Sequence, residues 1–436
     1  MDNSKERLRT IIEEYWRGDI PKIKKRDIAV DMNSDLISDI IGPRRAGKTY
    51  TMFSIISDLT LKINKRQTIY INFENRKLFP LTSEYLNNII QIIHEEDLLS
   101  NGIVYLFLDE IQRLDNWEKY IRSIYDEFKG KIKLFISGST SELIKSNASY
   151  LLTGRHITTL VLPLSFKEFL EFNNFVLRKV LTEEDKAKIG RYLKEYIEFG
   201  GFPEVVLNKN KEALVETLFL DIITKDVSKK VKNPTLLEEL AYFLCSNSAK
   251  PISFNTLKKT FESRFKISVP TLERMFYLMK EAFLFYDSMY FSYKLKNQMK
   301  YPKKIFCIDT GFINYYGFKF SEDKGKLMEN VVAIELMRHK IRNPEIYYWK
   351  DYRQNEIDFV IKKGTRIERL IQVTYSNSMV EINKREIDTL LKGMEELNCK
   401  DLLIITWDYE DKIKSGKNTI IIVPLWKWLL NIPSSR

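Results

Sequence analysis

The chain has 436 residues, of which 44% are hydrophobic and 30% are charged, and its formal net charge is +11. This length allows two or three domains around at least one large core, and the composition excludes a chain that is disordered by default. The positive charge favours an acidic partner, nucleic acid ahead of a membrane surface, although lysine-rich proteins are often basic only on a solvated face.

The three cysteines and three histidines are scattered and do not have the spacing of a metal site. An odd number of distant cysteines favours a reducing compartment over structural zinc, and we do not expect catalysis based on histidine. The N-terminus is charged, unlike a signal peptide, and no apolar run approaches the roughly 20 residues of a membrane span. We therefore expect a cytoplasmic protein without a membrane partner.

From about residue 35 to 165, short apolar runs alternate with segments of helical period. The predicted strands lie in SDIIGPRRAGKT, QTIYINFE, IVYLFLDE and IKLFISGS. Strands that alternate with helices indicate βαβ units on a parallel sheet.

The first predicted strand leads into GPRRAGKT and then into a helical segment, which is the context of a phosphate-binding loop. Two glycines let the backbone N–H groups turn toward phosphate oxygens, while Lys48 would reach the β- and γ-phosphates and Thr49 would hold Mg²⁺. Arg44 and Arg45 either contact phosphate or a neighbouring subunit, or are solvated. The predicted ATP-binding residues are Gly42, Pro43, Arg44, Arg45, Ala46, Gly47, Lys48 and Thr49.

The segment VYLFLDE, 104–110, predicts a buried strand that ends in two carboxylates. Asp109 would bind Mg²⁺ and Glu110 would orient the attacking water, whereas the alternative is an acidic helix N-terminus. The next strand, LFISGST, ends in Ser137 and Ser139, which are candidates for a sensor of the γ-phosphate or for a helix cap.

Farther along, residues 166 to 235 are largely helical, with a turn signal at GGFPE, 200–204. Residues 252–285 predict two helices joined by a short turn, the second starting at a Ser268 or Thr271 cap, and a basic, aromatic hairpin follows. The segment 325–425 returns to mixed α and β.

Taken in order, GPRRAGKT, LDEIQRLDNWEKYIRSIYD, ISGSTSELI, LLTGRHITTLVLPLSFKEFL, FGGFPEVV and DIITKDV resemble AAA-type ATP-binding proteins of archaea and bacteria that end in a nuclease-like domain of unknown function. The resemblance implies an α/β fold with four parts. These are a P-loop ATPase core at 1–165, a helical lid at 166–235, a winged helix at 236–310, and a restriction-endonuclease-like α/β domain at 311–436.

The resemblance also implies roles for single residues. Gly201 and Pro203 would approach the adenine, and Arg155 would act as a finger or sensor unless it forms a salt bridge within the core. The second helix of the winged helix would lie in the major groove, although such modules also bind proteins. The lysines expected to contact phosphates are Lys294, Lys296, Lys300, Lys303 and Lys304.

The segment NEIDFVIKKGTRIERLIQVTY, 355–375, predicts a β-hairpin. Glu329 and Asp358 match the metal-binding carboxylates of the nucleases that the C-terminal part resembles. At the next two positions of that site, Gln372 replaces a glutamate and Thr374 replaces a lysine. We therefore expect a degenerate site that does not cleave DNA, unless Lys362 or its neighbour Lys363 supplies the missing cation. The alternative is a domain that binds DNA or another subunit.

These patterns predict an Mg²⁺-dependent ATPase, working as a homo-oligomer, whose nucleotide state controls a basic C-terminal half that binds DNA mostly without sequence specificity. The first alternative is an ATP-regulated, metal-dependent nuclease. The second is a nucleotide-switched scaffold with negligible turnover.

Overall fold

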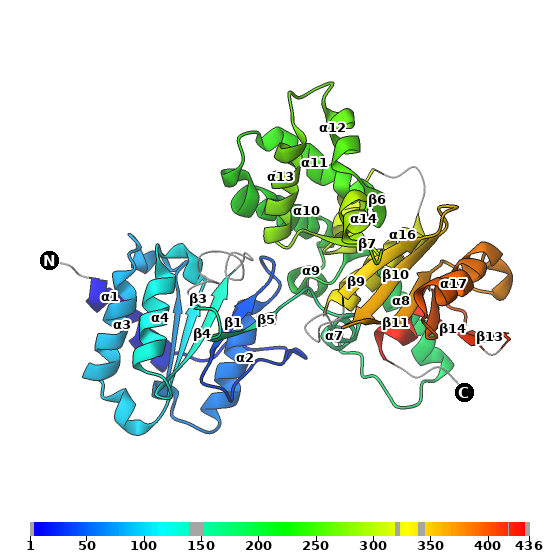
Figure 1. Ribbon diagram of the computed structural model, residues 1–436. Helices are drawn as coiled ribbons and strands as arrows, with labels where there is room; N and C mark the ends of the chain where they lie inside the picture. Colours follow the sequence, from blue (N-terminus) through cyan, green and yellow to red (C-terminus); the bar gives the residue numbers. More distant parts are fainter. Residues whose placement is uncertain (1–3, 139–151, 319–322, 339–344, 417, 432–436) are drawn as a thin grey trace. The chain divides into compact units, whose positions relative to one another are not determined.

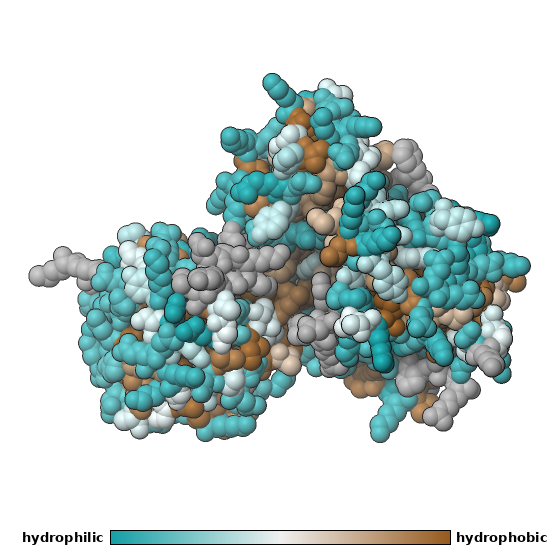
Figure 2. Space-filling view, in the orientation of Figure 1, coloured by the Kyte–Doolittle hydropathy of each residue, from teal (hydrophilic) through white to brown (hydrophobic). Residues whose placement is uncertain are grey.

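The computed structural model describes residues 4–138, 152–318, 323–338, 345–416 and 418–431, and it has two compact units, Met1–Leu162 and Pro163–Arg436 (Figure 1). The fold is mixed α/β, as predicted, with a parallel five-stranded sheet in unit 1 and a separate mixed sheet in unit 2. Hydrophilic side chains cover most of the face of each unit that Figure 2 shows. Within the described ranges, no helix combines the length and the apolar character needed to cross a membrane.

Unit 1 alternates strands and helices, which confirms the predicted βαβ pattern. Its sheet has the order β2-β3-β4-β1-β5, and every neighbouring pair is parallel. The elements are α1 (Ser4–Arg17), β1 (Ile37–Ile41), α2 (Lys48–Thr60), η1 (Lys65–Gln67), β2 (Thr68–Asn72), η2 (Arg76–Leu78), α3 (Glu84–Glu95), η3 (Leu98–Asn101), β3 (Val104–Asp109), η4 (Ile111–Arg113), α4 (Trp117–Glu127), β4 (Ile132–Gly138) and β5 (His156–Leu160).

Helices cover both faces of this sheet, with α2 on one face and α3 and α4 on the other (Figure 1). The chain crosses from β1 to the far edge at β2 and then returns through β3 and β4, so right-handed crossovers place α2 opposite the other two helices. Phe107 and Phe135 stack beneath α2, with ring centroids 4.5 Å apart, in a core that includes Ile40 and Met52. Since the winding direction changes between β1 and β4, their carboxyl ends are where a ligand site is expected.

The first part of unit 2 is helical, as predicted for residues 166 to 235, and the GGFPE turn joins α8 to α9. A capping box formed by Thr182 and Asp185 begins α8, and Gly200 ends it. The helical elements are α7 (Phe166–Phe172), α8 (Glu183–Phe199), α9 (Pro203–Leu207), α10 (Lys211–Asp221), η5 (Ile222–Val227), η6 (Ser228–Lys230) and α11 (Pro234–Ser246).

The predicted pair of helices is confirmed as α12 (Phe254–Phe261) and α13 (Val269–Glu281). Ser268 is the N-cap of α13, because its hydroxyl accepts the backbone N–H of Thr271 at 3.3 Å. The antiparallel strands β7 (Phe285–Tyr290) and β8 (Lys303–Cys307) follow, with α14 (Leu295–Lys300) between them.

These strands belong to one nine-stranded sheet with the order β13-β14-β12-β11-β10-β9-β7-β8-β6. The turn between β10 and β11 contains Gly364 at φ +59°, which confirms the predicted hairpin. The remaining elements are β6 (Lys250–Ile252), α15 (Thr310–Tyr316), α16 (Lys324–Arg338), β9 (Glu345–Lys350), β10 (Glu356–Lys363), β11 (Arg366–Val373), η8 (Met379–Glu381), α17 (Lys384–Leu397), β12 (Leu402–Thr406), β13 (Asp411–Ser415), β14 (Asn418–Pro424) and α18 (Leu425–Leu429).

Candidate functional site

The predicted phosphate loop lies at the carboxyl end of β1, between that strand and α2. Gly42 has φ +152°, and a Cβ at this position would lie 2.0 Å from the carbonyl oxygen of Val161. The neighbouring backbone therefore leaves no space for a side chain where the strand turns into the loop. The strand, loop and helix follow one another as the sequence predicts.

Lys48 and Thr49 form the first turn of α2 and point in different directions. The Lys48 ammonium is buried and donates to the carbonyl oxygens of Gly42 and Pro43, at 3.1 and 3.0 Å. The Thr49 hydroxyl donates to Oδ2 of Asp109 at 2.7 Å. The structure thus places a buried cation inside the loop and joins the loop to the end of β3.

Asp109 is fully buried, and its carboxylate is contacted by donors from two other strands and a helix. Besides Thr49, Oδ2 accepts the Tyr70 hydroxyl at 2.8 Å and is 3.5 Å from the Asn72 amide nitrogen. The other oxygen, Oδ1, accepts the hydroxyl of Ser137 at the end of β4. Burial, reinforced by the Asp109 charge, raises the pKa of Tyr70, so this hydroxyl stays a donor.

Sequence reasoning missed the contributions of Tyr70 and Asn72. Both residues lie on β2, and Asn72 is in parallel register with Asp109. A signal was available in the sequence, because a parallel neighbour of β3 must bring its last polar side chains to the same edge.

Glu110 follows Asp109 with a left-handed backbone, φ +55°. Its N–H donates to the Ser137 hydroxyl at 3.1 Å, and its Oε2 accepts the Gln112 amide at 2.5 Å. Burial raises the pKa of Glu110, while the charge of Lys48 opposes this shift. The structure therefore places the second carboxylate at the same edge of the sheet. Ser137 holds the backbone of Glu110, and Gln112 holds its side chain.

The other polar residues predicted for this site lie in different places. Arg44 is 3.8 Å from the carboxylate of Glu74, and Arg45 is exposed in the loop. Ser139 lies outside the described residues.

Arg155 precedes β5 at the amino end of the sheet, where its side chain donates to Asp126 of α4 at 3.1 Å. The length of β1, about 16 Å for five residues, separates that end from the phosphate loop. A catalytic role of Arg155 in the site of its own chain is therefore wrong. A role in the site of a neighbouring copy stays a prediction.

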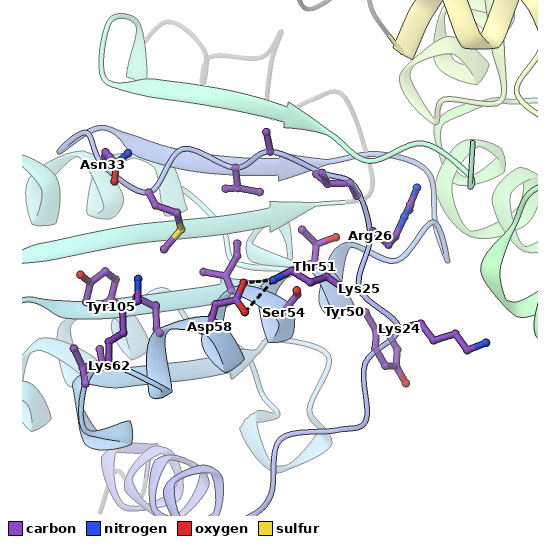
Figure 3. Close-up of a pocket in the computed structure, with 17 residues that line it drawn as sticks. Lys24, Lys25, Arg26, Asn33, Tyr50, Thr51, Ser54, Asp58, Lys62 and Tyr105 are labelled. Carbon is purple, nitrogen blue, oxygen red and sulfur yellow. Dashed lines mark hydrogen bonds and ion pairs between the residues drawn. The ribbon is translucent and has the colours of Figure 1, made fainter. Parts of the chain in front are cut away.

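A pocket of about 490 Å³ lies along α2, between this helix and the segment that precedes β1 (Figure 3). Arg26, on that segment, donates to the carbonyl of Ala46 at 2.7 Å and so connects the pocket wall to the phosphate loop. Lys25 forms an ion pair with Asp58 at 2.7 Å, on the rim. The lining residues are Lys24, Lys25, Arg26, Ile28, Ala29, Val30, Met32, Asn33, Tyr50, Thr51, Ser54, Ile55, Asp58, Leu59, Lys62, Ile63 and Tyr105.

In unit 2, the structure places Gly201 against a buried carboxylate. Its N–H donates to Oδ2 of Asp309 at 2.8 Å, and Oδ1 accepts the N–H of Gly311 at the same distance. Pro203 begins α9, two residues farther on. The N–H of Gly201 thus has its hydrogen-bond acceptor within unit 2. That Gly201 and Pro203 approach the adenine stays a prediction.

We expect Asp309 to make the stability of unit 2 depend on pH. Burial raises the pKa of Asp309 from its ordinary value of 3.8 to about 7, although two N–H donors oppose the shift. The folded state therefore holds a proton that the unfolded state has lost, and the free energy of unfolding falls as the pH rises from about 4 to about 7. At about 1.4 kcal/mol per pKa unit, the loss is on the order of 4 kcal/mol.

Urea unfolding between pH 5 and pH 8 measures this dependence. Asp309→Asn, which cannot ionise, should unfold with a shallower pH dependence than the wild type. Asp388→Asn, at an exposed position on α17, should keep the wild-type dependence. Equal pH profiles for Asp309→Asn and wild type would contradict the assignment.

The hairpin of unit 2 carries a second candidate site, which we call the Lys304 cluster: Lys304, Glu329, Glu356 and Asp358. The Lys304 ammonium is 2.5 Å from Oε1 of Glu356 and 2.9 Å from Oδ1 of Asp358, and it also contacts Oε1 of Glu329. One oxygen from each carboxylate lies within 4.8 Å of the others. Burial alone would lower the pKa of Lys304, but the three carboxylates raise it well above the ordinary value.

The cluster confirms that Glu329 and Asp358 meet and corrects the prediction for Lys304. This lysine is 0% exposed and cannot contact DNA phosphates from a wing. The prediction that Lys362 or Lys363 supplies the missing cation is wrong as well. Lys362 pairs with Glu345 at 2.8 Å, and Lys363 is 3.7 Å from Glu368. Sequence reasoning missed Lys304 because it reaches the hairpin from β8, more than 50 residues away.

Gln372 and Thr374, the two altered positions, lie beside this cluster. The N–H of Val373, between them, donates to Oδ2 of Asp358 at 2.9 Å. Thr374 hydrogen-bonds Glu386 of α17, and burial together with the Asp358 charge raises the pKa of Glu386 to about 7. Oε1 of Gln372 is buried, and none of the described residues donates a hydrogen bond to it.

Relatives from archaea and bacteria match nearly the whole chain. The uncharacterized protein MJ1544 of Methanocaldococcus jannaschii is 35% identical over 426 residues, which cover 94% of this chain and 91% of the relative. An uncharacterized protein of Haemophilus influenzae is 28% identical over 404 residues, covering 91% of this chain and 95% of that one.

Family profiles divide the chain into three matched segments. An AAA domain matches residues 34–170, a domain of unknown function, DUF8612, matches 190–323, and another, DUF4143, matches 324–428. Among solved structures, a Walker-type ATPase of Pyrococcus abyssi aligns over 72% of this chain and 95% of its own, with 13% identity and a TM-score of 0.43. The Orc1 protein of Aeropyrum pernix, solved in complex with DNA, aligns over 77% and 94%, with 11% identity and a TM-score of 0.31.

Proposed function

Because this chain belongs to the same family as the protein MJ1544 of Methanocaldococcus jannaschii and its residues 34–170 match an AAA domain, we propose that it is an Mg²⁺-dependent ATPase. Its nucleotide state controls a basic C-terminal half that binds DNA, and it works as a homo-oligomer in the cytoplasm. The proposal is supported by one observation above all, the hydrogen bond between Thr49 and Asp109 beside the buried ammonium of Lys48.

The residues at the carboxyl ends of β1 and β3 fit Mg²⁺ and a triphosphate. A hydroxyl and a carboxylate, from Thr49 and Asp109, are oxygen ligands of the kind that Mg²⁺ takes in proteins. The Lys48 ammonium, which donates to the loop carbonyls of Gly42 and Pro43, would exchange these for β- and γ-phosphate oxygens. When bound, Mg²⁺ neutralises charge that develops on the phosphates.

Glu110 is the residue that would position the attacking water. Its carboxylate is on the same edge as Asp109, and the amide of Gln112 holds one of its oxygens, which limits the rotamers of the side chain. A water that hydrogen-bonds the other oxygen would be oriented and polarised for in-line attack on the γ-phosphate.

The pocket along α2 is where the nucleoside would bind. Tyr50 and Thr51 line this pocket and directly follow the Mg²⁺-binding Thr49, while Arg26 joins its opposite wall to Ala46. In Figure 3, Arg26, Tyr50 and Thr51 lie toward the carboxyl end of β1, where the phosphates would be. A nucleotide that spans the loop and the pocket would keep the 24–33 segment packed against α2.

The surface of unit 2 near α14 is the proposed contact with DNA. Lys294, Lys296 and Lys300 are exposed on or next to this helix, together with the exposed side chains of Tyr293 and Met299. Such a surface would bind phosphates without reading bases, so its affinity for DNA should fall steeply with added salt.

The test is ATP turnover with and without duplex DNA. We expect Glu110→Gln to keep ATP binding and to lose turnover by at least about 100-fold, because the amide cannot polarise the water as a carboxylate does. Glu127→Gln, at the exposed end of α4, is the matched control and should retain wild-type turnover. DNA should stimulate the wild type.

The possible results separate the parts of the proposal. Turnover that is equal in Glu110→Gln and wild type would exclude Glu110 as the positioning residue. If DNA left turnover unchanged, DNA binding by unit 2 would not control the ATPase. Tight ATP binding without any turnover would support the nucleotide-switched scaffold instead.

A further inference from the structure

The Lys304 cluster has the dimensions of a divalent metal site but holds an ammonium group at its centre. Two oxygens bound to one Mg²⁺ are at most about 4.2 Å apart, and two bound to one Ca²⁺ at most about 5 Å. The three carboxylate oxygens all lie within 4.8 Å of one another, which is inside the Ca²⁺ limit, and they would close by at most about 0.6 Å to reach the Mg²⁺ limit. The Lys304 nitrogen contacts every one of them and so lies where a metal would lie.

A second observation, independent of the carboxylates, points to a missing ligand. Oε1 of Gln372 is buried and has no hydrogen-bond partner in the part of the chain that the structure describes, and the residue is only 7% exposed. Ile371 pairs with Phe359 in the antiparallel ladder, so Gln372 is across from Asp358 and on the same face of the sheet. An amide oxygen on the face of Asp358 that accepts no hydrogen bond from the described residues is a ligand that a metal would use.

The charges around the cluster explain why it is stable with lysine at its centre. Lys326 is 2.7 Å from the second oxygen of Glu329, and Lys350 is 3.2 Å from the second oxygen of Glu356. With Lys304, three ammonium groups therefore face three carboxylates. Removing any one of these cations leaves a buried negative charge, which is strongly unfavourable unless another cation takes its place.

We propose that the Lys304 cluster is a cation site in which the Lys304 ammonium takes the place of a divalent metal, and that removing this side chain opens the cluster to Mg²⁺ or Mn²⁺. In the wild-type chain the ammonium ties β8 to α16 and β10 and excludes a metal ion. The cluster then works as an internal clamp of unit 2, and it supplies no metal for phosphodiester cleavage. This inference does not depend on ATP hydrolysis.

The experiment compares Mn²⁺ binding to the full-length wild type and to Lys304→Met without nucleotide, by electron paramagnetic resonance of free Mn²⁺. Lys304→Met should bind one more Mn²⁺ per chain than the wild type. MnCl₂ should raise the melting temperature of this variant by several degrees more than that of the wild type. Lys303→Met is the matched control, because Lys303 is the adjacent residue of β8 and pairs with Asp287 at 2.9 Å, outside the cluster.

Further variants make every outcome decisive. Lys304→Ala, whose shorter side chain leaves room for a hydrated ion, should gain the same Mn²⁺, and adding Asp358→Asn to either variant should remove it. Equal Mn²⁺ binding by wild type and both Lys304 variants would overturn the proposal. So would a wild-type Mn²⁺ site that Asp358→Asn abolishes, or Lys304 variants that stay unfolded in MnCl₂.

Discussion

Lys48→Ala is expected to lower ATP turnover by two to three orders of magnitude. The ammonium of Lys48 is buried inside the loop and donates to the carbonyls of Gly42 and Pro43, so it lies beside the proposed phosphate position and exchanges these acceptors for phosphate oxygens when ATP binds. A preorganised donor to charge that develops in the transition state contributes about 3 to 4 kcal/mol, and each 1.4 kcal/mol is a factor of ten in rate.

Steady-state phosphate release measures this effect, and circular dichroism verifies that the variant is folded. Lys119→Ala is the matched control, since Lys119 is exposed on α4. Its turnover should equal that of the wild type. If Lys48→Ala hydrolysed ATP at the wild-type rate, the proposed phosphate site would be refuted, whatever DNA does to the rate.

Gly200→Ala is expected to destabilise unit 2 by about 4 kcal/mol. Gly200 has φ +82° and ψ −167°, a region that is essentially restricted to glycine, which costs other residues about 1 to 3 kcal/mol. An added Cβ would also lie 1.5 Å from Oδ1 and 2.3 Å from Cγ of Asp309. Moving this buried carboxylate would disturb its hydrogen bonds to Gly201 and Gly311.

Urea unfolding followed by tryptophan fluorescence measures the loss. Gly190→Ala provides a control of opposite sign, because Gly190 lies within α8 and, apart from the backbone of this helix, no atom of the described residues is within 4 Å of its Cβ position. Alanine there should stabilise the helix by about 0.5 to 1 kcal/mol. A Gly200→Ala chain that unfolds at the wild-type urea concentration would show that Asp309 and its neighbours move without cost.

The sequence alone was sufficient to predict the phosphate loop, the strand that ends in Asp109, and the hairpin around Gly364. Each of these features depends on residues that are neighbours in the sequence. An apolar run, a loop with glycines and a helical period specify strand, loop and helix, and a parallel sheet then brings the carboxyl ends of β1 and β3 to one edge. The roles of Lys48, Thr49 and Asp109 could be proposed for the same reason.

Only the tertiary structure decided which distant residues meet. It put Lys304 among three carboxylates instead of on a basic surface, Gly201 against Asp309, and Arg155 at the amino end of the sheet. A lysine in a short strand has the same local pattern whether its ammonium faces water or a buried carboxylate. The difference depends on which distant elements pack around this lysine. Here they are α16, with Glu329, and β10, whose Asp358 is 54 residues away on a strand that is not a neighbour of β8.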